Sequence, residues 1–205
     1  MRSRKLEKLF GILSIITIII GNVLCVGVLN KYCSFEYWCL LTPWCSLISL
    51  GYLVLELMYL RQYKKGVVSS ALLYMSVTSC VWVSVMSMLF WQPMYATFSY
   101  SLRLGLFILE KVLPILMVCQ WLVGPHRRFR KFHVHFALGC WLFYLVVILG
   151  LNALGHGVGV GSMCVPYSFL NMEQLGWQIL VINLLLMSGF YYLYCWIWVA
   201  IDHLW

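Results

Sequence analysis

The sequence predicts an all-α integral membrane protein, a six-helix bundle that forms a single transmembrane domain over residues 1–205. Hydrophobic residues make up 63% of the chain and charged residues 10%, whereas a soluble domain has about 45–50% and 25%. Six long apolar segments follow one another, and the basic residues fall in short clusters between them. A soluble globule of this composition would have an apolar surface, so we expect most of the chain to lie in lipid.

Each of the six segments is long enough to cross a bilayer, which takes about 20 mostly apolar residues. The first segment is too continuous, and is followed by too many others, to be a cleaved signal peptide. The connections are short and leave no room for a soluble domain. In chain order, the expected spans are Leu9–Leu29, Cys39–Leu60, Val67–Trp91, Gly105–Gly124, Phe132–Leu151 and Gly176–Ile201.

The distribution of positive charge predicts the orientation of the chain. The formal net charge is +8, and eleven of the fourteen Lys and Arg residues lie at the N-terminus and in the connections at 61–66 and 125–131. Because cytoplasmic loops carry the excess of Lys and Arg, we expect a multi-pass protein of the cell membrane with both termini in the cytoplasm. Basic clusters beside apolar segments favour membrane lipids as partners and argue against nucleic acid. Trp121 is expected near the inner interface.

The nine cysteines are scattered and show neither a C-x-x-C pair nor a Cys/His metal spacing. We therefore expect no metal site and no cofactor. Cys33 and Cys164 are predicted on the outer side, where a disulfide between them is left open. Nothing in the pattern indicates an oligomeric state.

The fourth expected span carries two charged residues and a proline. A charge inside a span costs about 2.5–3.5 kcal/mol on insertion scales, so Glu110 and Lys111 require a reason. Pro114 deprives the residue four positions earlier, Glu110, of its backbone partner and kinks the helix there. We expect Glu110, in the outer third of the span, either to face a cavity or to pair with Arg103 or Lys31 at the rim. Lys111 faces elsewhere, because neighbours on a helix diverge by about 100°.

Thr42 enters the second span from the outer side, immediately before Pro43. In one interpretation Thr42 is an N-cap and Pro43 the first helical residue. In the other, Thr42 and Glu110 both lie about 5–10 Å below the outer rim, where hydroxyl and carboxylate face a common cavity. His156, on a glycine-rich outer loop, is either a solvated loop residue or reaches the same mouth. Lys111 and His156 are therefore candidate binding residues.

Several short motifs resemble a known group of membrane proteins. They are Leu41-Thr42, Val112-Leu113-Pro114 with Trp121, Val165-Pro166-Tyr167-Ser168-Phe169-Leu170, Leu175-Gly176-Trp177, Asn183 and Asp202. The chain, from about the second span to the C-terminus, resembles the bacterial six-span proteins of the Pr-six-Pr type. These are relatives of the androgen-induced and androgen-dependent TFPI-regulating membrane proteins.

The resemblance implies a six-helix fold. For the animal members it also implies a threonine hydrolase of fatty-acid esters of hydroxy fatty acids, in which a histidine just before the fourth-span proline is the base. Thr42 matches the nucleophile, but Glu110 stands where the bacterial motif has histidine. Cys45-Ser46 replaces an expected Ser-Asn, and Gln120 replaces an expected acidic residue. These departures suggest an altered mechanism or a member that has lost hydrolysis.

The expected function is thus a polytopic membrane protein with an outward-facing cavity for a lipid or acyl ester. If it is an enzyme, Thr42 is the nucleophile and Glu110 the base, because a hydroxyl attacks only when a base within about 2.6–3.2 Å takes its proton. One alternative is a non-catalytic subunit that binds or transports a small molecule and depends on Glu110 but not on Thr42. Another is a membrane scaffold protein, in which neither residue matters beyond folding.

Overall fold

The computed structural model describes residues 4–26, 37, 39–63, 70–90, 99–124, 129–154, 167 and 170–204. The regular secondary-structure elements in this part of the chain are all helices. They are α1 (Arg4–Val26), α3 (Leu41–Tyr63), α4 (Ser70–Phe90), α5 (Tyr100–Phe107), the π-helix η2 (Ile108–Val112), α6 (Leu113–Val123), α7 (Lys131–Ala153) and α8 (Met172–Leu204). Because α5, η2 and α6 follow one another without a break, they form a single rod.

Among the described residues, six helical rods are long and apolar enough to cross a membrane. This agrees with the six predicted segments. The fourth rod, Tyr100–Val123, begins five residues earlier than expected. Ser99 starts it as an N-cap, its side chain accepting a hydrogen bond from the Leu102 N–H.

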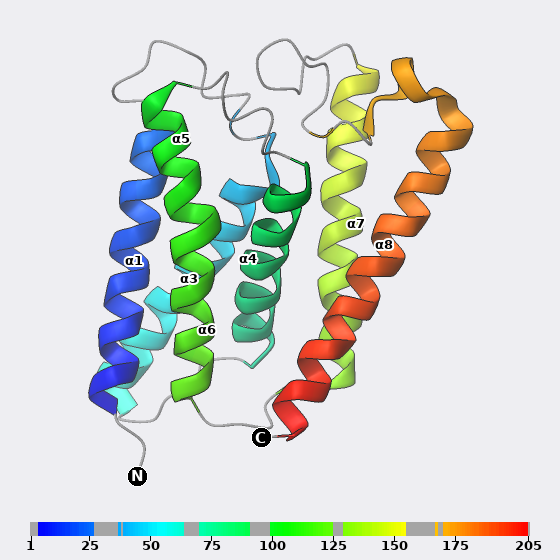
Figure 1. Ribbon diagram of the computed structural model, residues 1–205. Helices are drawn as coiled ribbons and strands as arrows, with labels where there is room; N and C mark the ends of the chain where they lie inside the picture. Colours follow the sequence, from blue (N-terminus) through cyan, green and yellow to red (C-terminus); the bar gives the residue numbers. More distant parts are fainter. Residues whose placement is uncertain are drawn as a thin grey trace.

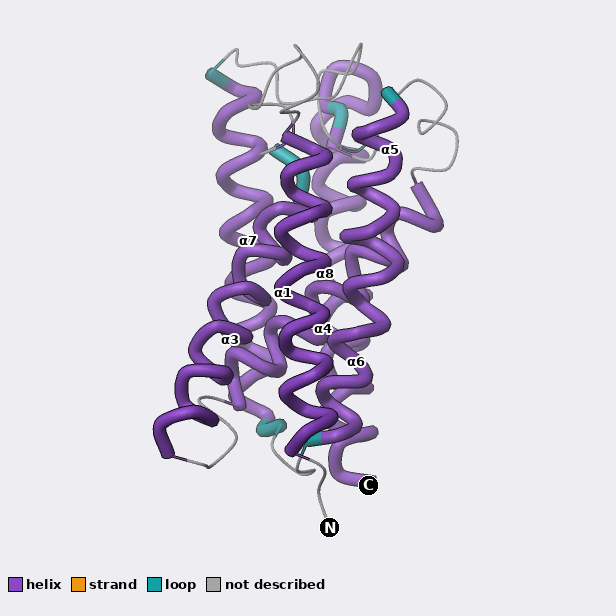
Figure 2. The backbone as a smooth tube through the Cα atoms, turned by 90° about the vertical axis from the view of Figure 1, so that its left-hand side faces the viewer, coloured by secondary structure: helices purple, strands orange, loops and turns teal. Residues whose placement is uncertain are grey.

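The rods run side by side along one axis (Figures 1 and 2). Helix α1 packs against α5 and α6, α3 packs against α4, and α7 packs against α8. The start of α1 and the end of α8 lie at the same end of the bundle (Figure 1). We call the opposite end of the bundle the far end.

Helix α1 meets the fourth rod at two glycines. A Cβ on Gly105 would lie 2.8 Å from the Gly21 carbonyl oxygen and 2.5 Å from the Cys25 Sγ, and a Cβ on Gly21 would lie 2.6 Å from Leu109. Small residues of this kind let two membrane helices approach closely without a hydrophobic driving force between them. The contact fixes α1 against the part of the rod that carries Glu110.

An aromatic core joins α4, α7 and α8. Trp82 on α4 lies with its ring centroid 6.2 Å from that of Trp141 on α7 and 5.1 Å from that of Tyr191 on α8. The outer side of α8, in contrast, exposes large apolar side chains such as Leu185 (69%) and Phe190 (60%). A buried side that packs on neighbouring helices and an exposed apolar side are what a helix at the lipid boundary of a bundle requires.

Candidate functional site

Thr42 lies inside the first turn of α3, which begins at Leu41. The expectation that Thr42 is the N-cap is therefore wrong, since the helix starts one residue earlier. Two hydrogen bonds hold the approach to this turn: the Tyr144 hydroxyl of α7 donates to the Cys39 carbonyl at 2.9 Å, and the Leu40 N–H donates to the Tyr37 carbonyl at 3.0 Å. The start of α3 is thus fixed by contacts that leave the Thr42 hydroxyl available.

Glu110 lies in η2, the π turn between α5 and α6. Leu113 closes this turn by donating its N–H to the Ile108 carbonyl five residues earlier. Proline has no N–H to give to the carbonyl four residues before it, and here Pro114 follows the wide turn directly. The disturbance predicted at Glu110 therefore takes the form of a π turn, a feature that is frequent at functional sites.

The two predicted residues meet. The Thr42 Oγ1 donates a hydrogen bond of 2.8 Å to the Glu110 Oε1. Both residues are buried, with 3% and 2% of their surface exposed. The prediction that an alcohol and a carboxylate come together is confirmed at the level of geometry. Of the two rim cations considered for Glu110, Arg103 is exposed, and Lys31 lies outside the described residues.

The pair lies deeper along the fourth helix than expected. Glu110 is ten residues beyond Tyr100, about 15 Å along the helix axis at 1.5 Å per residue. Thr42 reaches this level because α3 begins well below the far end of α5 (Figure 1). The pair is therefore inside the bundle rather than near the rim.

Three further polar groups lie beside the pair. The Tyr37 hydroxyl donates to the Asn22 Oδ1 at 2.7 Å, and the Asn22 Nδ2 donates to the Ser46 Oγ at 3.2 Å. Burial raises the pKa of Tyr37 above its usual value, with the nearby Cys25 and Glu110 adding to the effect, so the phenol remains a donor. Asn22 thus makes the interhelical hydrogen bonds that are the ordinary role of a mid-span asparagine.

Lys111 faces away from this cluster, as predicted. Its Nζ donates to the Ser87 Oγ at 2.6 Å and to the Ser84 carbonyl at 3.2 Å, both on α4. The two neighbouring residues of the π turn therefore point in different directions: Glu110 contacts α3, and Lys111 contacts α4. His156, Cys33 and Cys164 lie outside the described residues.

A small cavity of about 110 Å³ lies next to the first turn of α3. Leu41 and Cys45, on either side of Thr42 in the sequence, line it together with aromatic side chains that include Trp82 and Trp141. The indole nitrogen of Trp82 is buried and has no hydrogen-bond partner among the described residues. Thr42 is not among the residues that line this cavity, and its hydroxyl is turned toward Glu110 in η2.

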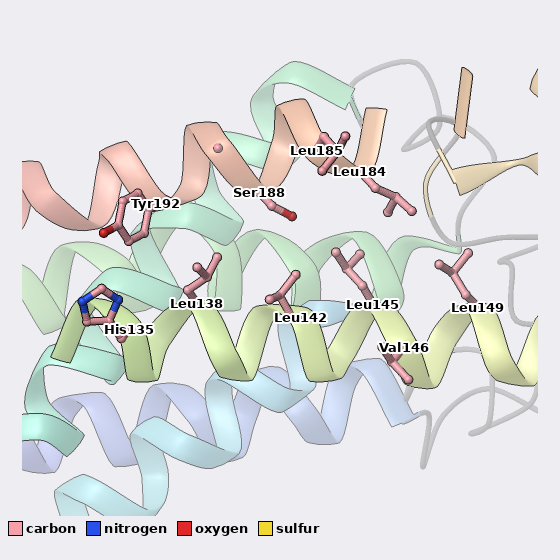
Figure 3. Close-up of a pocket in the computed structure, with 11 residues that line it drawn as sticks. His135, Leu138, Leu142, Leu145, Val146, Leu149, Leu184, Leu185, Ser188 and Tyr192 are labelled. Carbon is pink, nitrogen blue, oxygen red and sulfur yellow. The ribbon is translucent and has the colours of Figure 1, made fainter. Parts of the chain in front are cut away.

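A larger groove of about 610 Å³ lies between α7 and α8 (Figure 3). Leucines from both helices line its length, and His135 and Tyr192 face each other at one end. Apart from these two residues, Ser188 is the polar side chain in the lining. An aliphatic groove of this kind suits lipid chains and supplies no nucleophile beside a base.

Asp202 is a buried carboxylate that the residue pattern did not reveal. Its Oδ1 accepts from the Trp121 Nε1 at 2.8 Å, and its Oδ2 accepts from the Phe129 N–H at 2.9 Å. Trp121, near the end of α6, is 3% exposed, and its indole points inward to Asp202. Both carboxylate oxygens tie the end of α6 and the start of α7 to α8, which is a structural role.

Comparison of the chain with protein-family models, curated proteins and solved structures gave no match. The resemblance to the bacterial six-span proteins of the Pr-six-Pr type stays a prediction, and the candidate site stands on its geometry.

Proposed function

We propose that this chain is a membrane-embedded hydrolase of acyl esters, with Thr42 as nucleophile and Glu110 as general base. The observation that supports it is the 2.8 Å hydrogen bond from the Thr42 Oγ1 to the Glu110 Oε1. A nucleophile and a base within about 2.6–3.2 Å are the signature of covalent catalysis by a hydroxyl. The six apolar rods make membrane lipids the accessible substrates.

The proposed reaction has two halves. In the first, Glu110 takes the Thr42 hydroxyl proton while the Oγ1 attacks the ester carbonyl carbon; the bond to the alcohol then breaks, and the alcohol leaves with the proton from Glu110. In the second, Glu110 takes a proton from water, and the hydroxide displaces Thr42 from the acyl carbon. The carboxylic acid leaves, and the proton returns to the Thr42 oxygen.

The start of α3 offers stabilisation for the developing oxyanion. The first N–H groups of a helix have no partner within the helix, and their end of the helix carries positive potential. Thr42 lies in this first turn, and Pro43 after it has no N–H to give. The backbone N–H of Thr42 itself is therefore the donor that we assign to the oxyanion.

The proposed orientation places both termini in the cytoplasm and the far end of the bundle outside. It rests on the clustering of eleven of the fourteen Lys and Arg residues on the side of the termini. An acyl ester would then reach the pair from the outer leaflet. The Glu110 carboxylate takes the part that histidine plays in the proteins that the chain resembles.

A second candidate is a binding or transport subunit without covalent chemistry. The burial of both members of the pair, at 3% and 2% exposure, favours it. In this case the carboxylate would hold a ligand or an ion, and the Thr42 hydroxyl would only orient it. The two candidates therefore differ in what removal of the hydroxyl does.

Hydrolysis by purified protein in lipid nanodiscs tests the proposal. A panel of acyl esters is offered to the wild type and to the variants Thr42→Ala and Glu110→Gln. We expect each substitution to lower kcat by about 100-fold or more, the usual contribution of a nucleophile–base pair. Thr42→Ser, which keeps a hydroxyl, retains measurable activity.

Thr78→Ala is the matched control. Thr78 is also a fully buried threonine, but its hydroxyl donates to the Tyr74 carbonyl of its own helix at 2.7 Å. Its variant should hydrolyse esters at the wild-type rate. Turnover by Thr42→Ala equal to that of Thr78→Ala would exclude the enzyme, and ligand binding that depends on Glu110 alone would establish the second candidate.

A further inference from the structure

A second groove lies on the other side of the π turn, between α4 and α6. Its volume is about 400 Å³. The α4 side is built from residues spaced three and four apart, which places them on one helix face. The lining residues used below are Val81, Val85 and Met88 of α4, Ile115 and Val118 of α6, and Lys111. We call this the Lys111 groove.

The Lys111 groove is open on the lipid-facing side of the bundle. Met88 and Ile115, one on each wall, expose 57% and 64% of their surface. Every other wall residue named above is aliphatic, so the groove has the lining that a hydrocarbon chain requires. Its volume suits a chain segment rather than a bulky ring system.

Lys111 places a positive charge at one end of this apolar groove. The ammonium bonds to Ser87, three residues before the end of α4 at Phe90, so the charge lies toward the far end of the bundle. The walls continue from there toward the other end through Val81 and Val118. A cation at one end and an aliphatic trough below it match an amphiphile with a negative head and an apolar tail.

The ammonium has unused binding capacity within the described residues. A lysine has three N–H donors, and two of them are used by the Ser84 carbonyl and the Ser87 hydroxyl. Both partners are neutral, so they hold the ammonium without cancelling its charge. The neighbouring Glu110 carboxylate attracts the ammonium electrostatically, but it accepts a hydrogen bond from Thr42 on another helix. A charge in this position is costly unless an anion accompanies it.

We propose that the Lys111 groove binds a long-chain fatty acid, with the carboxylate on Lys111 and the chain between α4 and α6. We favour a carboxylate over a phospholipid head group for a steric reason. The ammonium lies below the end of α4, and a phosphodiester bound there would also bring the bulky second substituent of its head group below that end. A charge-assisted hydrogen bond from the remaining ammonium N–H would hold the head. The Ser87 hydroxyl positions the ammonium but does not bind the head, because it already donates to the Ser84 carbonyl at 2.9 Å. The groove does not depend on hydrolysis at Thr42.

Photolabelling of the full-length protein in phosphatidylcholine nanodiscs tests this site. The probe is a palmitic acid analogue that carries a diazirine on the chain and an alkyne for detection, and mass spectrometry locates the adducts. We expect adducts on the α4 and α6 peptides, with competition by palmitate but not by hexadecanol, which has the same chain without the charge. Lys111→Met should reduce labelling about tenfold or more, and Lys111→Arg should retain it.

Ile115→Trp gives a second variant that keeps the charge and fills the groove from an exposed position. Labelling should fall in this variant and should persist in Leu186→Trp, a matched substitution at an exposed leucine of α8 (53%). Thr42→Ala should label like the wild type, which separates this site from the proposed hydrolase. Undiminished labelling of Lys111→Met, or equal competition by hexadecanol, would overturn the proposal. Stronger competition by lysophosphatidate than by palmitate would overturn the carboxylate in favour of a phosphate head.

Discussion

Several buried serine and threonine hydroxyls on α3 and α4 donate to a carbonyl of their own helix. Ser49 donates to the Cys45 carbonyl at 2.9 Å and Thr78 donates to the Tyr74 carbonyl at 2.7 Å, each four residues back. This is the ordinary way for a membrane helix to satisfy a hydroxyl. Thr42 departs from it, because its hydroxyl donates to a carboxylate on another helix. The contrast is the residue-level reason to treat Thr42 as a candidate nucleophile.

Loss of the Asp202 carboxylate should lower the stability of the fold. Both of its oxygens are hydrogen-bonded and the residue is fully buried. Asp202→Ala leaves the Trp121 indole and the Phe129 N–H without an acceptor, so we expect the free energy of unfolding to fall by about 3 kcal/mol. Steric trapping in bicelles measures the change. His203→Ala, at the next and exposed position, should change it little, and equal losses in the two variants would contradict the structural role of Asp202.

At the residue scale, the sequence predicted the Thr42–Glu110 pair but not the hydrogen bonds from Trp121 and Phe129 to Asp202. Thr42, directly before Pro43, and Glu110, four residues before Pro114, are conspicuous because each is a polar residue in an apolar span. Asp202 lies near the end of the chain, where a charged residue is expected at a membrane surface. Its burial depends on how α8 crosses the end of α6, and a single sequence contains no signal for that.

The π turn at Ile108–Val112 is the element that separates the two candidate sites. It directs Glu110 toward α3 and Lys111 toward α4. Pro114 made a local disturbance predictable, but proline alone does not distinguish a kink from a wide turn. The five extra residues at the start of the fourth rod were missed because Tyr100, Ser101 and Arg103 lower its local hydropathy.

The close contact between α1 and α5 makes Gly105 a sensitive position. A Cβ there would meet the Gly21 carbonyl oxygen at 2.8 Å, and backbone cannot move aside as a side chain can. We expect Gly105→Ala to lower the free energy of unfolding by about 2 kcal/mol through overpacking. In Gly139→Ala, where nothing lies within 4 Å of the added carbon, the better helix propensity of alanine should leave stability equal or higher. The same unfolding measurement compares the two, and a Gly105→Ala protein as stable as Gly139→Ala would show that the contact is loose.

The whole molecule is a helical bundle whose spans follow from composition. Hydropathy identifies membrane helices well because a buried backbone in lipid has to satisfy its own hydrogen bonds. The order of packing, with α1 against the fourth rod and α7 against α8, depends on side-chain fit and was not predicted.

The orientation of the bundle is testable with fusions. We expect green fluorescent protein at the C-terminus to fluoresce, because this terminus is proposed to be cytoplasmic. Alkaline phosphatase inserted at 91–98, which connect the far ends of α4 and α5, should be active, and the same enzyme inserted at 64–66 should be inactive. Active phosphatase at 64–66 would invert the proposed topology and place the Thr42–Glu110 pair in the inner half of the membrane.

The central claim is that Glu110 activates Thr42 for attack on an acyl ester, and trapping of the covalent intermediate tests it most directly. Purified protein is exposed to an activated ester such as a p-nitrophenyl acyl ester, quenched in acid and digested, and peptides are searched for an added acyl group. The account predicts an acyl ester on Thr42 that is absent from Thr42→Ala and strongly reduced in Glu110→Gln. Hydrolysis without any acyl group on Thr42, or the same adduct in wild type and Glu110→Gln, would contradict it.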